Sequence, residues 1–126
     1  KVTAEHAGEP DKNGQFRIVS RTEIIEPNDV CTDSYLIIGA SEDKSIVENE
    51  YKYIQTRFTR FLLMLAVSSI NLSPDKFQFI PLQDFTEKSD IDWNRTIFEI
   101  DQQFYRKYKL SDEEIYFIEK MVKPVQ

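Results

Sequence analysis

The segment KSIVENEYKYIQTRFTRFLLMLAV, residues 44–67, carries the strongest periodic pattern in the chain. Apolar side chains recur there at alternating steps of four and three, the spacing of one face of an α-helix. The members of this face are Val47, Tyr51, Ile54, Phe58, Phe61 or Leu62, and Leu65. We therefore predict one continuous helix from about Lys44 to about Val67, with Ser41 capping its start and the apolar face buried.

The opposite face of this predicted helix is polar and basic. It presents Lys52, Thr56, Thr59 and Arg60, with Arg57 on its flank. Residues 51–81 carry four basic side chains and one acidic side chain, whereas residues 1–50 have a net charge of −6 and residues 82–126 a net charge of −3. Such a face can contact DNA phosphates or a base edge. The alternative is a solvated face that pairs with Glu48, Glu50 or neighbouring loops.

Two β-rich stretches precede the predicted helix. The opening residues 1–14 are polar and punctuated by glycine and proline, as in a loop or flexible lead-in. Gln15–Glu26 is rich in β-forming residues, and Ser34–Gly39 is a continuous apolar run typical of a buried strand. We expect the apolar face of the helix to pack against the second of these strands.

After the helix, the pattern predicts a loop over Ser68–Lys76, a third strand over Phe77–Ile80 and an irregular polar stretch over Leu82–Asn94. A helix from about Thr96 to Tyr108 follows, and its expected buried residues are Ile97, Ile100, Phe104 and Tyr108. Ser111–Glu114 is a capping box for a last helix, which ends before Pro124. The last helix is expected to bury Ile115, Phe117, Ile118, Met121 and Val122.

The element order β-β-α-β-α-α predicts an α+β fold, in which a small sheet of about three strands packs with a long central helix and two C-terminal helices. The 126 residues suit a single domain. Because the chain starts at Lys1 without a methionine, we expect it to be a fragment of a larger protein. No run of 18 apolar residues and no secretory signal are visible, and Cys31 is the only cysteine. These features favour a cytoplasmic protein without membrane contact.

Residues that would carry catalysis are nearly absent from the sequence. The three glycines are too scattered for a phosphate-binding loop, and no Asn/Asp-Pro-Pro-Tyr tetrapeptide occurs. We interpret His6 as a solvated histidine and Cys31 as an inert thiol. The acidic cluster Asp84, Glu87, Asp90 and Asp92 can in principle hold magnesium, but a solvated loop is the favoured interpretation. The sequence therefore predicts no catalytic residue, no metal site and no cofactor in this chain.

Five motifs, in order and at matching spacing, resemble the C-terminal region of bacterial type II restriction–modification DNA adenine-N6 methyltransferases. They cover roughly 100 residues. In order, they are PNDVCTDSYLIIG (residues 27–39), YIQTRFTRFL (53–62), FQFIPLQDF (77–85), DIDW (90–93) and YRKYKLSDEEI (105–115). Lys109 stands where the family commonly has glycine, a difference at a helix end, and Arg57 stands where it often has lysine.

The resemblance implies a non-catalytic part in target recognition on double-stranded DNA. In such enzymes an upstream methyltransferase domain binds S-adenosylmethionine and flips an adenine, and a fused endonuclease is present in some. The expected DNA-binding residues are Lys52, Thr56, Arg57, Arg60 and Lys76. The alternative is a structural or protein-interaction domain that clamps the recognition region to the catalytic domain. A contiguous positive patch over Arg57 and Arg60 favours the first reading, and burial of both beside carboxylates favours the second.

Overall fold

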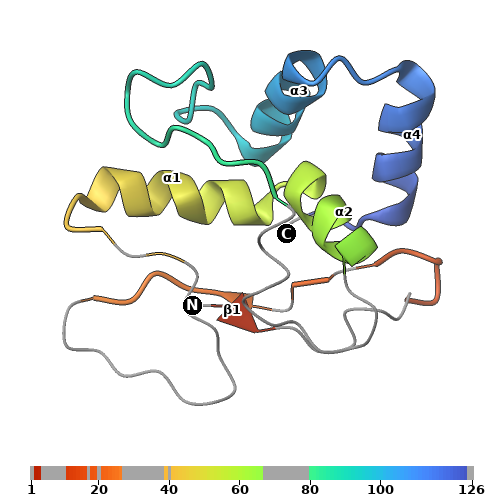
Figure 1. Cartoon of the computed structure of the whole chain (residues 1–126). Helices are drawn as coiled ribbons and strands as arrows, with labels where there is room; N and C mark the ends of the chain where they lie inside the picture. Colours follow the sequence, from red (N-terminus) through yellow and green to blue (C-terminus); the bar gives the residue numbers. More distant parts are fainter. Residues whose placement is uncertain are drawn as a thin grey trace.

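The computed structural model describes residues 2–3, 11–16, 18–19, 21–26, 39, 41–66 and 80–124. Within these ranges the chain forms four helices: α1 (Lys44–Gln55), α2 (Arg57–Ala66), α3 (Ile97–Lys107) and α4 (Asp112–Met121). Two short strands, β1 (Val2–Thr3) and β2 (Arg21–Thr22), pair antiparallel. Helix α2 packs against the other three helices, and α1 also contacts α3. Figure 1 shows α3 and α4 on one side of the α1–α2 pair and β1 on the other.

The prediction of an α+β fold with a three-stranded sheet is wrong, because the described part of the chain is mostly helical. Among the described residues of the β-rich stretch Gln15–Glu26, which leave out residues 17 and 20, only Arg21 and Thr22 form a strand. Phe16 instead bridges to the end of α4: its N–H donates to the Met121 carbonyl (2.7 Å) and its carbonyl accepts from the Lys123 N–H (2.8 Å).

Ile18 gives the physical reason why this stretch is not a continuous strand. Its φ of 66° lies in the left-handed region, which a β-branched residue rarely adopts and which breaks an extended ladder. The Ile18 and Val19 side chains are buried against α1, α2 and the end of α4. The other two predicted strands, Ser34–Gly39 and Phe77–Ile80, and the loop Ser68–Lys76 lie outside the described residues, apart from Gly39 and Ile80.

The start of α1 is capped differently from the prediction. Asp43, not Ser41, is the N-cap residue, since its carboxylate accepts a hydrogen bond from the Ser45 N–H at 2.9 Å. The Ser41 hydroxyl accepts from the Asp43 N–H at 3.1 Å and so orders the capping residue. An ionised carboxylate at this position also complements the positive end of the helix dipole.

Helices α3 and α4 begin where the sequence predicted, and α4 does so at its predicted capping box. The Thr96 hydroxyl accepts from the Glu99 N–H at the start of α3, and the capping box of Ser111 and Glu114 at the start of α4 is complete. Ile100, Phe104, Ile118 and Val122 are buried as predicted. Phe117 is not, because its side chain is 49% exposed. None of the four helices in the described ranges has the length and apolar character needed to cross a lipid bilayer.

An aromatic cluster forms the main core between α1, α2, α3 and the segment before α3. Phe104 is fully buried at its centre, with the ring centroids of Tyr53 and Phe58 both 5.1 Å away and that of Trp93 5.9 Å away. The Trp93 indole N–H donates to the Asp84 carbonyl at 2.9 Å. These contacts fasten the irregular residues 80–96 onto the helices, since an amphipathic aromatic ring can bury its body while its polar atom is satisfied.

Helix α3 ends in a Schellman motif that places Lys109 in a left-handed conformation. The Leu110 N–H donates to the Tyr105 carbonyl (2.9 Å) and the Lys109 N–H to the Arg106 carbonyl (3.2 Å). Lys109 has a φ of 54°, a region that costs an L-residue roughly 1–2 kcal/mol. The glycine common at this position in the resembling family would adopt it without that cost.

We expect Lys109→Gly to raise the free energy of unfolding by about 0.5–1 kcal/mol, because relief of the left-handed strain outweighs the added flexibility of the unfolded chain. Urea unfolding measures the change. Lys109→Ala is the matched control, since it removes the same charge but keeps the Cβ atom. Equal stability of the glycine and alanine variants would contradict the assignment of strain to this residue.

Candidate functional site

The helix predicted over residues 44–67 is divided at Thr56, and the polar cluster around this division is the candidate site. Thr56 has an extended conformation (φ −65°, ψ 150°). Its hydroxyl donates to the Tyr53 carbonyl at 2.7 Å and accepts from the Thr59 N–H at 3.1 Å. Thr56 therefore ends α1 and caps α2, a use of threonine that competes with continued helix. We call this place the α1–α2 junction, made of Thr56, Arg57, Thr59, Arg60 and Asp101.

Asp101 reaches the junction from α3. Its carboxylate accepts hydrogen bonds from the Arg57 N–H at 3.0 Å and the Phe58 N–H at 2.9 Å. With the bond from Thr59 to Thr56, the N–H groups of the first three residues of α2 are satisfied by side chains. A carboxylate also suits the positive end of the α2 dipole. Asp101 is only 3% exposed, so it acts as a buried anion that holds the start of α2.

The two arginines of the junction bind backbone carbonyls at helix ends. Arg57 Nε donates to the Val122 carbonyl at the end of α4 (3.0 Å). Arg60 Nε donates to the carbonyls of Gln55 (3.1 Å) and Thr56 (3.3 Å) at the end of α1. Both guanidinium groups also favour the ionised form of Asp101. The junction therefore connects α2 to the ends of α1 and α4 and to the middle of α3.

Three of the five predicted DNA-binding residues belong to this buried network, and a fourth, Lys52, is bound to the segment before α3. Thr56 is fully buried, Arg60 is 4% exposed, and Arg57 is half-buried. The half-buried Lys52 Nζ donates to the Trp93 carbonyl at 2.6 Å. Lys76 lies outside the described residues. The expectation that Thr56, Thr59 and Arg60 form a solvated face is wrong, because the extended Thr56 resets the helical phase of α2. Contact of these residues with DNA stays a prediction.

Burial controls the charge state of the junction. It raises the pKa of Asp101 from the usual 3.8 to about 6, while the Phe58 and Arg57 N–H groups and the two guanidinium groups oppose the rise. The Tyr105 hydroxyl is buried and has no hydrogen-bond partner among the described residues. Burial and the neighbouring Asp101 raise the pKa of Tyr105. Because Asp101 is out of reach of solvent, this carboxyl is suited to fixing helices rather than to exchanging protons with a substrate.

We expect the contribution of Asp101 to stability to fall as the pH rises from about 4 to about 6. The folded state binds this proton more tightly than the unfolded state, so the proton-linked part of the stability is complete below the unfolded pKa and is lost through the folded pKa, while the hydrogen bonds to α2 remain. The loss is roughly 2–3 kcal/mol. Urea unfolding of the parent and of the non-titrating Asp101→Asn variant across this range measures it. If the difference in free energy of unfolding between the parent and Asp101→Asn stayed constant across this pH range, the pKa of Asp101 would not be raised by folding.

The acidic cluster after residue 80 is occupied by local contacts. Asp84 accepts from the Thr86 N–H and hydroxyl, Asp90 pairs with Lys107 at 2.9 Å, and Asp92 pairs with Arg95 at 3.2 Å. Glu87 is exposed. In the described part of the chain no three His, Cys, Asp or Glu side chains are grouped so as to hold a metal ion. His6 and Cys31 lie outside the described residues.

The residue that sequence reasoning missed is Asp101. Its signal was present: an acidic residue stands between Ile100 and Phe104, on the side of α3 that was predicted to be buried. A carboxylate on a buried face needs donors. In this case they are the first N–H groups of another helix.

Comparison of the chain with protein-family models, with curated proteins and with solved structures finds no match.

Proposed function

We propose that this chain is a non-catalytic C-terminal part of a bacterial type II restriction–modification adenine-specific DNA methyltransferase. In that enzyme it is a structural, protein-interaction domain that clamps the target-recognition region to the catalytic domain. The resemblance of five motifs to that family supports the proposal that the chain is part of such an enzyme. The parent would bind S-adenosylmethionine and double-stranded DNA in the cytoplasm, with the methyl-transfer residues upstream of this chain.

The observation that carries the clamp role is the direction of the two arginines. Arg57 and Arg60 donate to backbone carbonyls at helix ends and lie beside the Asp101 carboxylate. Arg60 is nearly inaccessible. Each arginine uses its Nε–H on a carbonyl within the fold, and the burial of Arg60 keeps its guanidinium group away from a phosphate in solution. The overall charge of −6 also suits a protein interface better than a DNA surface.

The two roles predict different salt dependence of DNA binding by the parent enzyme. The quantity to compare is the slope of the logarithm of the DNA-binding constant against the logarithm of the salt concentration. If Arg57 and Arg60 are clamp residues, the double variant Arg57→Ala/Arg60→Ala has the same slope as the unmodified enzyme, at a temperature where the variant is folded. If they contact phosphates, the slope falls by about one unit for each contact. Arg106→Ala is the control for loss of an exposed arginine.

The place in the parent enzyme has its own test. The full reading frame should contain an Asn/Asp-Pro-Pro-Tyr motif upstream of residue 1. A full-length reading frame without this motif would remove the methyltransferase assignment.

A further inference from the structure

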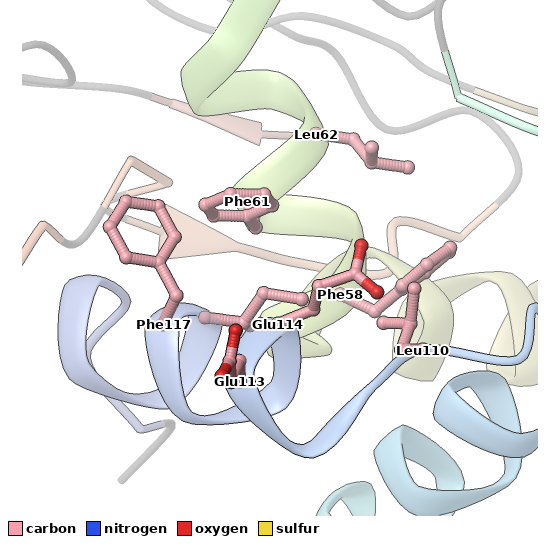
Figure 2. Close-up of a pocket in the computed structure, with 8 residues that line it drawn as sticks. Phe58, Phe61, Leu62, Leu110, Glu113, Glu114 and Phe117 are labelled. Atoms are coloured by element: carbon pink, nitrogen blue, oxygen red, sulfur yellow. The ribbon is translucent and has the colours of Figure 1, made fainter.

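An apolar groove lies between α2 and α4 (Figure 2). Its volume is about 420 Å³, within the range of sites that bind ligands or side chains. Figure 2 shows Phe61 of α2 close to Phe117 of α4, with the Leu62 side chain pointing away from Phe117. The residues that line the groove are Phe58, Phe61, Leu62, Leu110, Glu113, Glu114, Phe117 and Ile118.

The apolar surface continues beyond the groove along α2. Phe58, Phe61, Leu62 and Leu65 are spaced at i, i+3, i+4 and i+7, so they share one face over two helical turns, about 10 Å. Leu65 is 65% exposed and Phe117 49% exposed. The Phe61 and Phe117 rings meet edge to face with centroids 5.8 Å apart, which keeps the groove wall ordered. Exposed apolar surface of this length fits the side of an incoming helix.

The rim of the groove is acidic. Asp112, Glu113 and Glu114 form the first turn of α4. The Ser111 N–H and hydroxyl lower the pKa of Glu114, so this carboxylate is charged at neutral pH. In the described part of the chain no Lys or Arg forms an ion pair with these three residues.

We propose that this groove is the docking site for an amphipathic helix of a neighbouring domain, with apolar anchors at i, i+3, i+4 and i+7 and Lys or Arg beside them. The proposal rests on the clamp role above and names the chemistry of its partner. The acidic rim favours basic flanks on the partner. A second copy of the chain is a poorer occupant, because it would bring its own acidic α4 terminus to the interface and carries the same charge of −6.

Two synthetic helical peptides test the proposal on this chain. They have identical apolar anchors and differ only in Lys or Glu at the flanking positions. We expect the Lys peptide to bind with an affinity about tenfold higher than the Glu peptide, with a preference that weakens as salt is added. Phe117→Ser should weaken both peptides. Isothermal titration calorimetry measures these affinities.

Charge reversal supplies the matched control. Glu113→Lys changes an exposed carboxylate of the rim that takes no part in the capping box, and it should reduce or reverse the peptide preference. Glu87→Lys makes the same change in net charge on the loop that borders α1, away from the groove, and should leave the preference intact.

Three results would overturn the docking site: equal affinity for the two peptides, equal effects of the two reversals, or self-association of the chain that Phe117→Ser abolishes. None of these results would contradict the proposed assignment to a methyltransferase, which is tested by the upstream reading frame.

Discussion

Asp101→Ala should lower the free energy of unfolding at neutral pH by about 3 kcal/mol, although the substitution removes only a small side chain. Without the carboxylate, the Arg57 and Phe58 N–H groups lose their acceptor at the buried start of α2. Arg57 and Arg60 also lose the nearby anion that offsets their charge. Relief of the desolvation of Asp101 itself offsets part of this loss. Urea unfolding gives the magnitude.

The control for this prediction is Asp112→Ala, which removes a carboxylate from the first turn of another helix but at an exposed position. Its expected cost is about 0.5 kcal/mol, the value of a solvated charge near a helix terminus. Hydrogen exchange adds a local readout, since the Arg57 and Phe58 amides should exchange faster only in Asp101→Ala. Similar stability losses in the two variants, with unchanged exchange, would mean that Asp101 does not cap α2.

The helices whose limits are determined locally were predictable from the sequence. The start of α3 near Thr96 was predicted from the spacing of the apolar residues that follow it, and the start of α4 from the capping box at Ser111; the structure confirms both starts. The division of the long helix was not predictable in this way. Thr56 lies within an otherwise uninterrupted helical pattern, and the acceptor that stabilises the start of α2 comes from Asp101, 44 residues beyond Arg57. The spacing of apolar residues every three or four positions contains no information about a contact between residues so far apart in the sequence.

One missed break also explains part of the error in the predicted core. Before Thr56, Ile54 is buried as expected, but Val47 and Tyr51 are only partly buried and the unpredicted Tyr53 is buried. Beyond Thr56 the fully buried position is Leu63, whereas Leu65, which continued the predicted face, is largely exposed. The same shift turns Thr59 and Arg60 inward. Three predicted DNA-binding residues, Thr56, Arg57 and Arg60, therefore lie in the α1–α2 junction with less exposure than the helical pattern indicated, and their contact with DNA stays a prediction.

The predicted sheet failed for a different reason. Composition favours extended backbone around Gln15–Glu26, but a strand also needs a partner with free backbone groups. Phe16 finds its partner at Met121 and Lys123, after α4, and the left-handed Ile18 then ends the extended path. β-propensity reports a preference for extended conformation and cannot identify which segment supplies the hydrogen bonds.

Phe58→Ala should lower the free energy of unfolding by about 3–5 kcal/mol, the largest effect that we expect from a single substitution in this chain. Phe58 is 6% exposed, and its ring stacks on Phe104 and on Tyr108 with both centroids 5.1 Å away. The control is Phe98→Ala on α3, where the ring is 62% exposed and the expected loss is below about 0.5 kcal/mol. Thermal and urea unfolding of both variants measure the difference. Phe58 is the second residue of α2, so an unchanged melting temperature for Phe58→Ala would mean that the helix after Thr56 presents a different face to α3. The same result would contradict the burial of Arg60, which depends on the same helical phase.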